Sequence, residues 1–147
     1  MNESELFALV ELFCQRSFDL GMARRTLGAP VESSLPDRVT LTPIDPRFRH
    51  VDVELLQPAV GPGTAFVAGL VIELREPAVL HFDQLTRRFG PPTMMPRLKP
   101  HQDVPYRFML KGADYEGYML LNVPVGSDGD ARHVRSVIIR RFPPEAR

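Results

Sequence analysis

The sequence of 147 residues is poor in three residue types, with one cysteine, no tryptophan and only two lysines. The single cysteine, Cys14, excludes an intrachain disulfide and any zinc site built from several cysteines. No apolar run approaches the roughly 20 residues that a membrane-spanning helix needs. The first residues also lack the basic region and long apolar core of a signal peptide, so we expect a cytoplasmic protein without a membrane partner.

The charge balance disfavours nucleic acid as a partner. Eighteen basic and eighteen acidic side chains cancel, so no overall field attracts a polyanion or an anionic membrane. Nearly all the basic residues are arginine, which a GC-rich genome or a need for planar, bidentate donors would each explain, and we expect a bacterial-type protein. Hydrophobic residues make up 44% and charged residues 24%, the balance of a globular protein. At this length we predict a single domain over residues 1–147.

Hydrophobic periodicity predicts an α+β fold with an antiparallel sheet of about six strands. An N-terminal helix is expected over residues 2–16, where Asn2 and Glu5 can form a capping box. A second helix is expected over 19–27, and a third carries an apolar stripe over 78–89. Three predicted strands follow each of the last two helices, over 38–44, 48–56, 64–74, 104–111, 115–123 and 133–142. Both faces of 64–74 are apolar, which predicts a central strand covered on both sides.

The second half of the chain repeats the element order of the first. Residues 25–30 (RTLGAP) align with 87–92 (RRFGPP), and residues 55–57 (LLQ) align with 120–122 (LLN). The offset between aligned segments only grows along the chain, and each increase falls where a loop could absorb an insertion. We therefore predict two tandem α-β-β-β repeats, over residues 18–77 and 80–143.

A helix that ends in Arg-Arg-Phe-Gly-Pro-Pro and leads into antiparallel strands, in two tandem copies, resembles the β-lactamase inhibitor protein architecture. It is also similar to the unit of the small lipoprotein subunit of the outer-membrane barrel-assembly machinery. The resemblance implies a binding scaffold with an exposed sheet face and transfers no functional residue. Those relatives are exported and the inhibitor carries a disulfide in each repeat, which Cys14 alone cannot supply.

The segment 90–105 is the predicted partner-binding site. It contains five prolines, and a stiff loop loses less entropy on binding. Met94 and Met95 offer adaptable apolar contact, with the donor Arg97 beside them. We predict a non-catalytic module of the inhibitor, immunity or adaptor type that binds another protein. The alternative is that the two methionines only seal the end of the sheet.

A polar cluster of His50, Asp52 and Glu54 favours a different function. On a strand these side chains project from one face, about 6.6–7 Å apart. They could line a groove for a small molecule or an enzyme's substrate, although the wet face of a half-buried strand explains the alternation equally. No common nucleophile or phosphate-loop motif is present in the sequence, and we predict no catalytic residue, metal or cofactor. A structural homodimer that pairs through an exposed strand edge is a further alternative.

Arginines gather near the C-terminus and could contact phosphate or a protein, with aromatic residues nearby that could stack on bases. A solvated sheet edge explains this charge equally well. The arginines are Arg132, Arg135, Arg140, Arg141 and Arg147.

Overall fold

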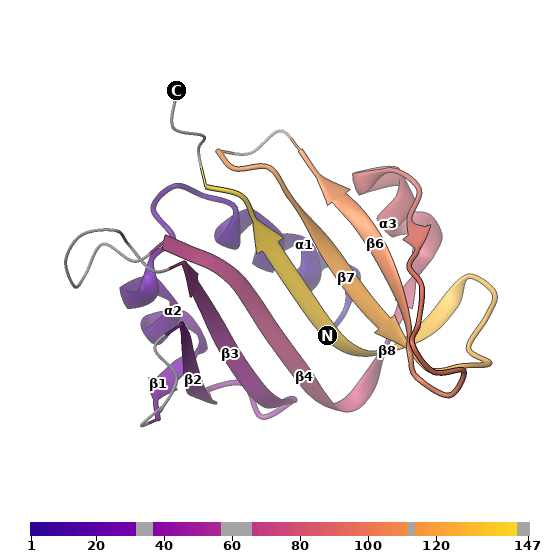
Figure 1. Cartoon of the computed structure of the whole chain (residues 1–147), viewed down its shortest axis with the longest axis horizontal. Helices are drawn as coiled ribbons and strands as arrows, with labels where there is room; N and C mark the ends of the chain where they lie inside the picture. The colour runs from indigo at the N-terminus through magenta and orange to yellow at the C-terminus, as the bar shows by residue number, and fades with distance from the viewer. Residues whose placement is uncertain (32–36, 57–65, 112–113, 144–147) are drawn as a thin grey trace.

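The computed structural model describes residues 1–31, 37–56, 66–111 and 114–143, which form an α+β fold (Figure 1). The helices are α1 (Glu3–Phe13), α2 (Leu20–Leu27) and α3 (Phe82–Phe89). The strands are β1 (Gly28–Pro30), β2 (Arg38–Pro43), β3 (Phe48–Leu56), β4 (Phe66–His81), β5 (Thr93–Met94), β6 (Val104–Leu110), β7 (Gly117–Val123) and β8 (Ala131–Arg141). In the described residues they form one antiparallel sheet of eight strands, in the order β1-β2-β3-β4-β8-β7-β6-β5.

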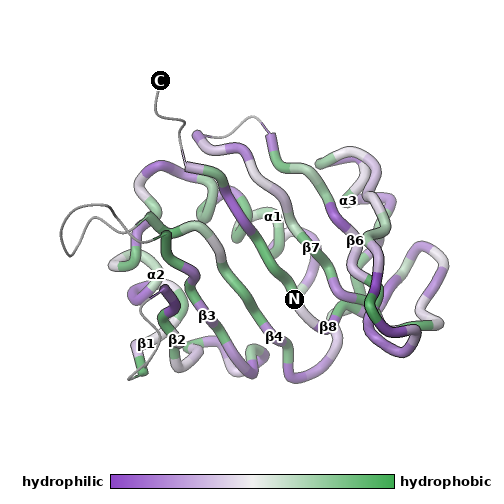
Figure 2. Tube along the Cα trace, viewed as in Figure 1, coloured by the Kyte–Doolittle hydropathy of each residue, from purple (hydrophilic) through white to green (hydrophobic). Residues whose placement is uncertain are grey.

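The three helices lie behind the sheet in the view of Figure 1 and cover one of its faces. Their buried side chains include Leu6, Phe13 and Leu85. Alternate residues of the strands pack against them, and the long central strand β4 is largely hydrophobic (Figure 2). The hydrophobic core therefore lies between the helices and one face of the sheet.

The predicted number of about six strands is wrong, because β1 and β5 were missed. β1 is three residues long and β5 is two residues long. Segments this short cannot show the alternation of apolar and polar residues by which a strand is recognised in sequence. Both lie at the edges of the sheet, next to prolines that limit further pairing.

The start predicted for the third helix is also wrong. Residues 78–81 belong to β4, where Ala78 pairs with Val134 and His81 pairs with Ala131. The strand continues past Pro77 because a register irregularity between Glu73 and Ala78 takes the proline out of the ladder. α3 then begins at Phe82.

The capping box predicted at the N-terminus is confirmed. The Glu5 N–H donates to Asn2 Oδ1 at 2.9 Å, and the Asn2 N–H donates to Glu5 Oε1 at 3.2 Å. Residues 14–16 lie beyond the end of α1, which is shorter than predicted. The cause is a side chain from the last strand, described below.

The two halves of the chain have the same element order, a helix followed by four strands, and they meet where β4 pairs with β8. The sheet order is accordingly symmetrical about this contact. That a duplication produced the two halves stays a prediction.

Candidate functional site

The face of the sheet opposite the helices has no helix on it in the described part of the chain (Figure 1). We call it the open face. Its central row runs across five strands, with each residue paired to the next: Asp52, Val71, Ile138, Leu120 and Arg107. Three aliphatic side chains therefore stand side by side at the middle of the open face, with a carboxylate at one end and a guanidinium at the other. All three are partly exposed.

The open face corrects one prediction about β4. The strand is central, as predicted, but helices cover only one of its faces. Val71 points to the open side and stays partly exposed, whereas Leu70 and Ile72 are buried beneath the helices. A strand with apolar residues on both of its faces is therefore not always covered by helices on both.

A second row crosses the open face beside the first and contains an ion pair. Arg140 donates from Nε to Glu54 Oε1 at 3.1 Å and from Nη1 to the hydroxyl oxygen of Tyr118 at 3.1 Å. Hydrogen bonds to Glu54 and then to Tyr118 raise the pKa of Arg140 above its usual value. Glu54 and Arg140 belong to strands separated by β4 and reach each other over Gly69, the residue paired with both.

The sequence-predicted trio of His50, Asp52 and Glu54 lies on the open side of β3, but its members are bound to neighbours. Asp52 is 6% exposed. It accepts a hydrogen bond from the Thr40 hydroxyl at 2.6 Å, and His50 Nε2 lies 2.9 Å from its Oδ2. Arg38 lies 3.8 Å from Asp52 and 3.9 Å from Glu54. The carboxylates on this half of the open face are therefore compensated by partners from within the chain.

Arg107, at the other end of the central row, has no such partner. Among the described residues its side chain makes no hydrogen bond or ion pair, and its Nε is buried without an acceptor. Its paired neighbours, Leu120 on β7 and Thr93 on β5, carry no charge. The result is a positive charge with neutral paired neighbours, whose Nη groups could pair with an external carboxylate or phosphate.

The predicted partner-binding residues lie at the β5 edge of the sheet. Met94 is 64% exposed. Met95 is partly buried, and its N–H donates to the Pro105 carbonyl at 2.8 Å. Arg97 Nη1 donates to the carbonyls of Pro100, at 2.9 Å, and Gln102, at 3.2 Å. Arg97 thus holds its own loop together instead of standing free beside the methionines.

Leu98 is the residue that sequence reasoning missed in this loop. Its side chain is 94% exposed, at a turn that Gln102 organises by accepting from the N–H groups of Leu98 and Lys99. A shallow hollow lies between the loop and the open face, and residues of both line it. Pro96, Arg97, Leu98, Gln102 and Asp103 line it from the loop, and Pro105, Asn122 and Ser136 line it from the sheet. The loop and the open face are therefore one continuous surface.

Among the described residues, the C-terminal arginines do not lie on one common face. Arg132 stacks on the rings of Phe82 and Tyr106, with its Cζ 4.6 and 4.5 Å from their centroids. Arg140 lies on the open face, whereas Arg141 points to the helices and is 3% exposed. Arg147 lies outside the described residues.

Arg141 explains why α1 ends early. Its guanidinium donates four hydrogen bonds to main-chain carbonyls, those of Val67, Phe13, Gln15 and Phe18, at 2.6 to 2.8 Å. The aromatic rings of Phe13, Phe18, Phe66 and Tyr115 surround it. Burial lowers the pKa of Arg141, although arginine stays protonated at neutral pH. The positive charge thus binds the carbonyls at the C-terminal end of the helix, where it is electrostatically favourable.

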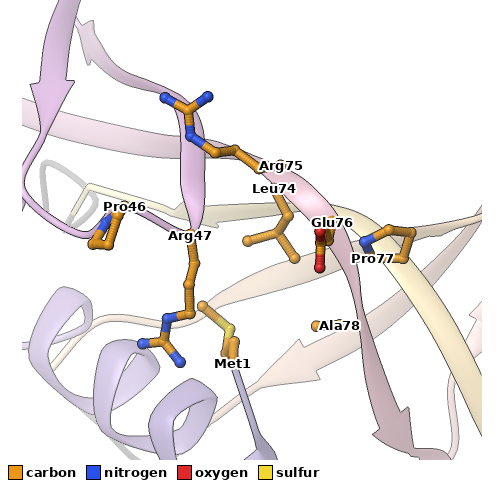
Figure 3. A pocket seen from close by; sticks show the side chains of 8 residues that line it. All are labelled: Met1, Pro46, Arg47, Leu74, Arg75, Glu76, Pro77 and Ala78. Atoms are coloured by element: carbon orange, nitrogen blue, oxygen red, sulfur yellow. The ribbon is translucent and has the colours of Figure 1, made fainter.

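A separate hollow lies where the pairing of β4 is interrupted, at residues 74–78 (Figure 3). Met1, Leu74 and Ala78 provide apolar surface. Arg47 at its rim is already bound by Asp45 and Glu5, and it lowers the pKa of both carboxyl groups. Its charge is thus compensated, which leaves less to attract a ligand than at Arg107.

Among the described residues, no group of three or more His, Cys, Asp or Glu side chains could hold a metal ion. None of the three helices is long and apolar enough to cross a membrane. No protein-family model matches the chain, and neither a curated protein nor a solved structure does.

Proposed function

We propose that the protein is a binding module that docks another protein on its open face and on the loop beside it, in the manner of an inhibitor, an immunity protein or an adaptor. The observation that carries this proposal is the central row of the open face. Three partly exposed aliphatic side chains, Val71, Ile138 and Leu120, lie together on a rigid sheet with no helix over them in the described residues. Contiguous apolar surface on a soluble domain marks interaction sites.

The loop at the β5 edge extends this surface. Met94 and Leu98 add exposed apolar side chains, and hydrogen bonds that Arg97 donates and Gln102 accepts hold the loop together. A preorganised loop loses little conformational entropy when a partner binds. A binding role thus accounts for an exposed leucine and methionine in a loop that is otherwise stiffened.

Strand edges are poorer docking sites than the open face. The edge strands β1 and β5 are three and two residues long, with prolines beside them that cannot donate a main-chain hydrogen bond. Addition of a partner strand, in a homodimer or otherwise, would therefore gain few hydrogen bonds. For this reason we place the partner on the face.

Affinity capture from the source organism tests the proposal. The wild-type chain should retain a partner protein, identified by mass spectrometry, whereas Ile138→Thr and the double variant Met94→Ser/Met95→Ser should lose most of it. Ile44→Ser is the matched control, because Ile44 is as exposed as Met94, at 64%, but lies in the turn between β2 and β3. Equal recovery by all four chains would remove the open face and its loop from the function.

A further inference from the structure

The charges of the open face are divided unequally between its two halves. On β3 and β4 the acids Asp52, Glu54 and Glu73 each lie within 4 Å of a histidine or arginine of the chain. On β6 the guanidinium of Arg107 has no acceptor in the described part of the chain. Arg107 is thus an uncompensated positive charge at the end of the aliphatic row.

Arg107 is partly exposed, and only its Nε is shielded from water. A guanidinium forms two parallel hydrogen bonds with a carboxylate in a plane. A partner carboxylate would therefore accept from the two Nη groups, which have no acceptor among the described residues.

The geometry points to a specific partner, an extended protein segment with an acidic residue and with apolar residues two and four positions away from it, both in the same direction along the segment. This inference rests on the proposed function. Neighbouring strands lie about 4.8 Å apart, so the row from Arg107 over Leu120 and Ile138 to Val71 spans about 14 Å. In an extended chain, side chains on one side recur about every 6.8 Å, so the positions i, i+2 and i+4 cover the same length. The acid contacts Arg107 and the apolar side chains lie on Leu120, Ile138 and Val71.

The same charges argue against nucleic acid. A phosphate backbone carries a negative charge at every nucleotide, whereas Arg38 and Arg140 on the open face are already paired with acids of the chain. A segment with a single carboxylate needs only Arg107. The open face thus fits a segment with one negative charge and an apolar continuation.

Selection from a displayed library of random twelve-residue peptides tests the inference without knowledge of the natural partner. The wild-type chain should enrich peptides that carry one Asp or Glu and apolar residues two and four positions away from it in the same direction. For an enriched peptide, replacement of its acid by the amide should weaken binding about fivefold or more. Arg107→Gln should abolish that difference between acid and amide peptides, and Arg107→Lys should reduce it.

Arg24→Gln is the matched control, since Arg24 is exposed on α2, on the other side of the sheet. It should leave the preference for the acid intact, and thermal unfolding of each variant shows whether it folds. Enrichment of apolar peptides without an acid, or an acid preference that survives in folded Arg107→Gln, overturns the inference while docking on the open face stands. Displacement of the peptide by a twenty-nucleotide oligothymidine at equal concentration overturns it in favour of nucleic acid. If no peptide is enriched the inference fails, and the capture experiment with Ile138→Thr decides separately whether the proposed function fails with it.

Discussion

Replacement of Arg141 by methionine should destabilise the protein more than any single change on the open face. Methionine keeps an unbranched apolar stem but removes every donor. The carbonyls of Phe13, Gln15, Phe18 and Val67 would lose their bond to the guanidinium. All four bonds are short, and the residue is 3% exposed, so water has little access to replace it.

The expected magnitude follows from these four bonds. A buried polar group left without a partner costs about 1–3 kcal/mol. The variant also avoids the desolvation of a buried cation, which offsets several kcal/mol of the gross loss. We expect a net decrease of about 3–5 kcal/mol in the free energy of unfolding, a large fraction of the roughly 5–15 kcal/mol that a domain has.

The neighbouring arginine is the matched control. Arg140 lies on the same strand but on the open face, with a side chain 40% exposed and paired to Glu54. Arg140→Met should therefore cost only about 0.2–1 kcal/mol. Urea unfolding followed by circular dichroism measures both values. If Arg141→Met lies within about 0.5 kcal/mol of the wild type, or loses no more than Arg140→Met, the reasoning about its buried hydrogen bonds is refuted.

Two further predictions concern single contacts. Gly69→Ala should abolish the coupling between Glu54 and Arg140, because an added Cβ would lie 2.1 Å from Glu54 Oε1. A double-mutant cycle should give a coupling energy of about 0.2–1 kcal/mol in the wild-type background and near zero in the alanine background. Equal coupling energies in both backgrounds would contradict this. His81 Nδ1 lies 2.8 Å from Glu3 Oε1, and this hydrogen bond is the main reason why the pKa of His81 is raised. Partial burial acts to raise the pKa of Glu3, but hydrogen bonds from His81 outweigh it, so the pKa of Glu3 is lowered overall. The pair therefore stabilises fully between the ordinary pKa values of about 4.5 for Glu3 and 6.5 for His81, and its contribution is lost as the pH falls through the folded-state pKa of Glu3 or rises through that of His81. The deficit of His81→Gln in the free energy of unfolding should thus be largest near pH 5.5 and shrink toward pH 9, and a deficit independent of pH would refute the assignment.

The long elements of the fold could be predicted from the sequence because each carries its own period. The sequence over 48–56 alternates between apolar and polar side chains, and the structure has β3 over the same residues. The capping box at Asn2 is a local signal within one helical turn, and it is present as predicted. β5 could not be found this way, since its two residues depend on pairing with Tyr106 and Arg107.

The open face could be predicted only in fragments. The sequence predicts the trio on β3 and the methionines of the loop, but as separate sites with different functions. Val71, Ile138 and Leu120 come from distant parts of the chain and become neighbours only through the register of β4, β8 and β7. That register is set by long-range pairing, which local patterns do not contain.

Arg140 and Arg141 show the same limit for charge. As neighbours in the sequence they are equivalent cations, and both were counted toward one basic cluster. Alternation along β8 sends one to the open face and the other beneath the helices. A fully buried arginine is rare, so no rule based on composition would have placed Arg141 among the carbonyls at the end of α1.

What distinguishes the open face from an ordinary wet sheet face is the combination of its parts. A face that only contacts water has no need for three aliphatic side chains in a row, and it keeps its arginines hydrated or paired. Here the acids are compensated within the chain, while Arg107 at the end of the aliphatic row is not. Under the proposed function, Arg107 and the apolar row together fix which end of the row the partner's acid contacts. We expect the acid at β6 and the partner's apolar residues toward β4.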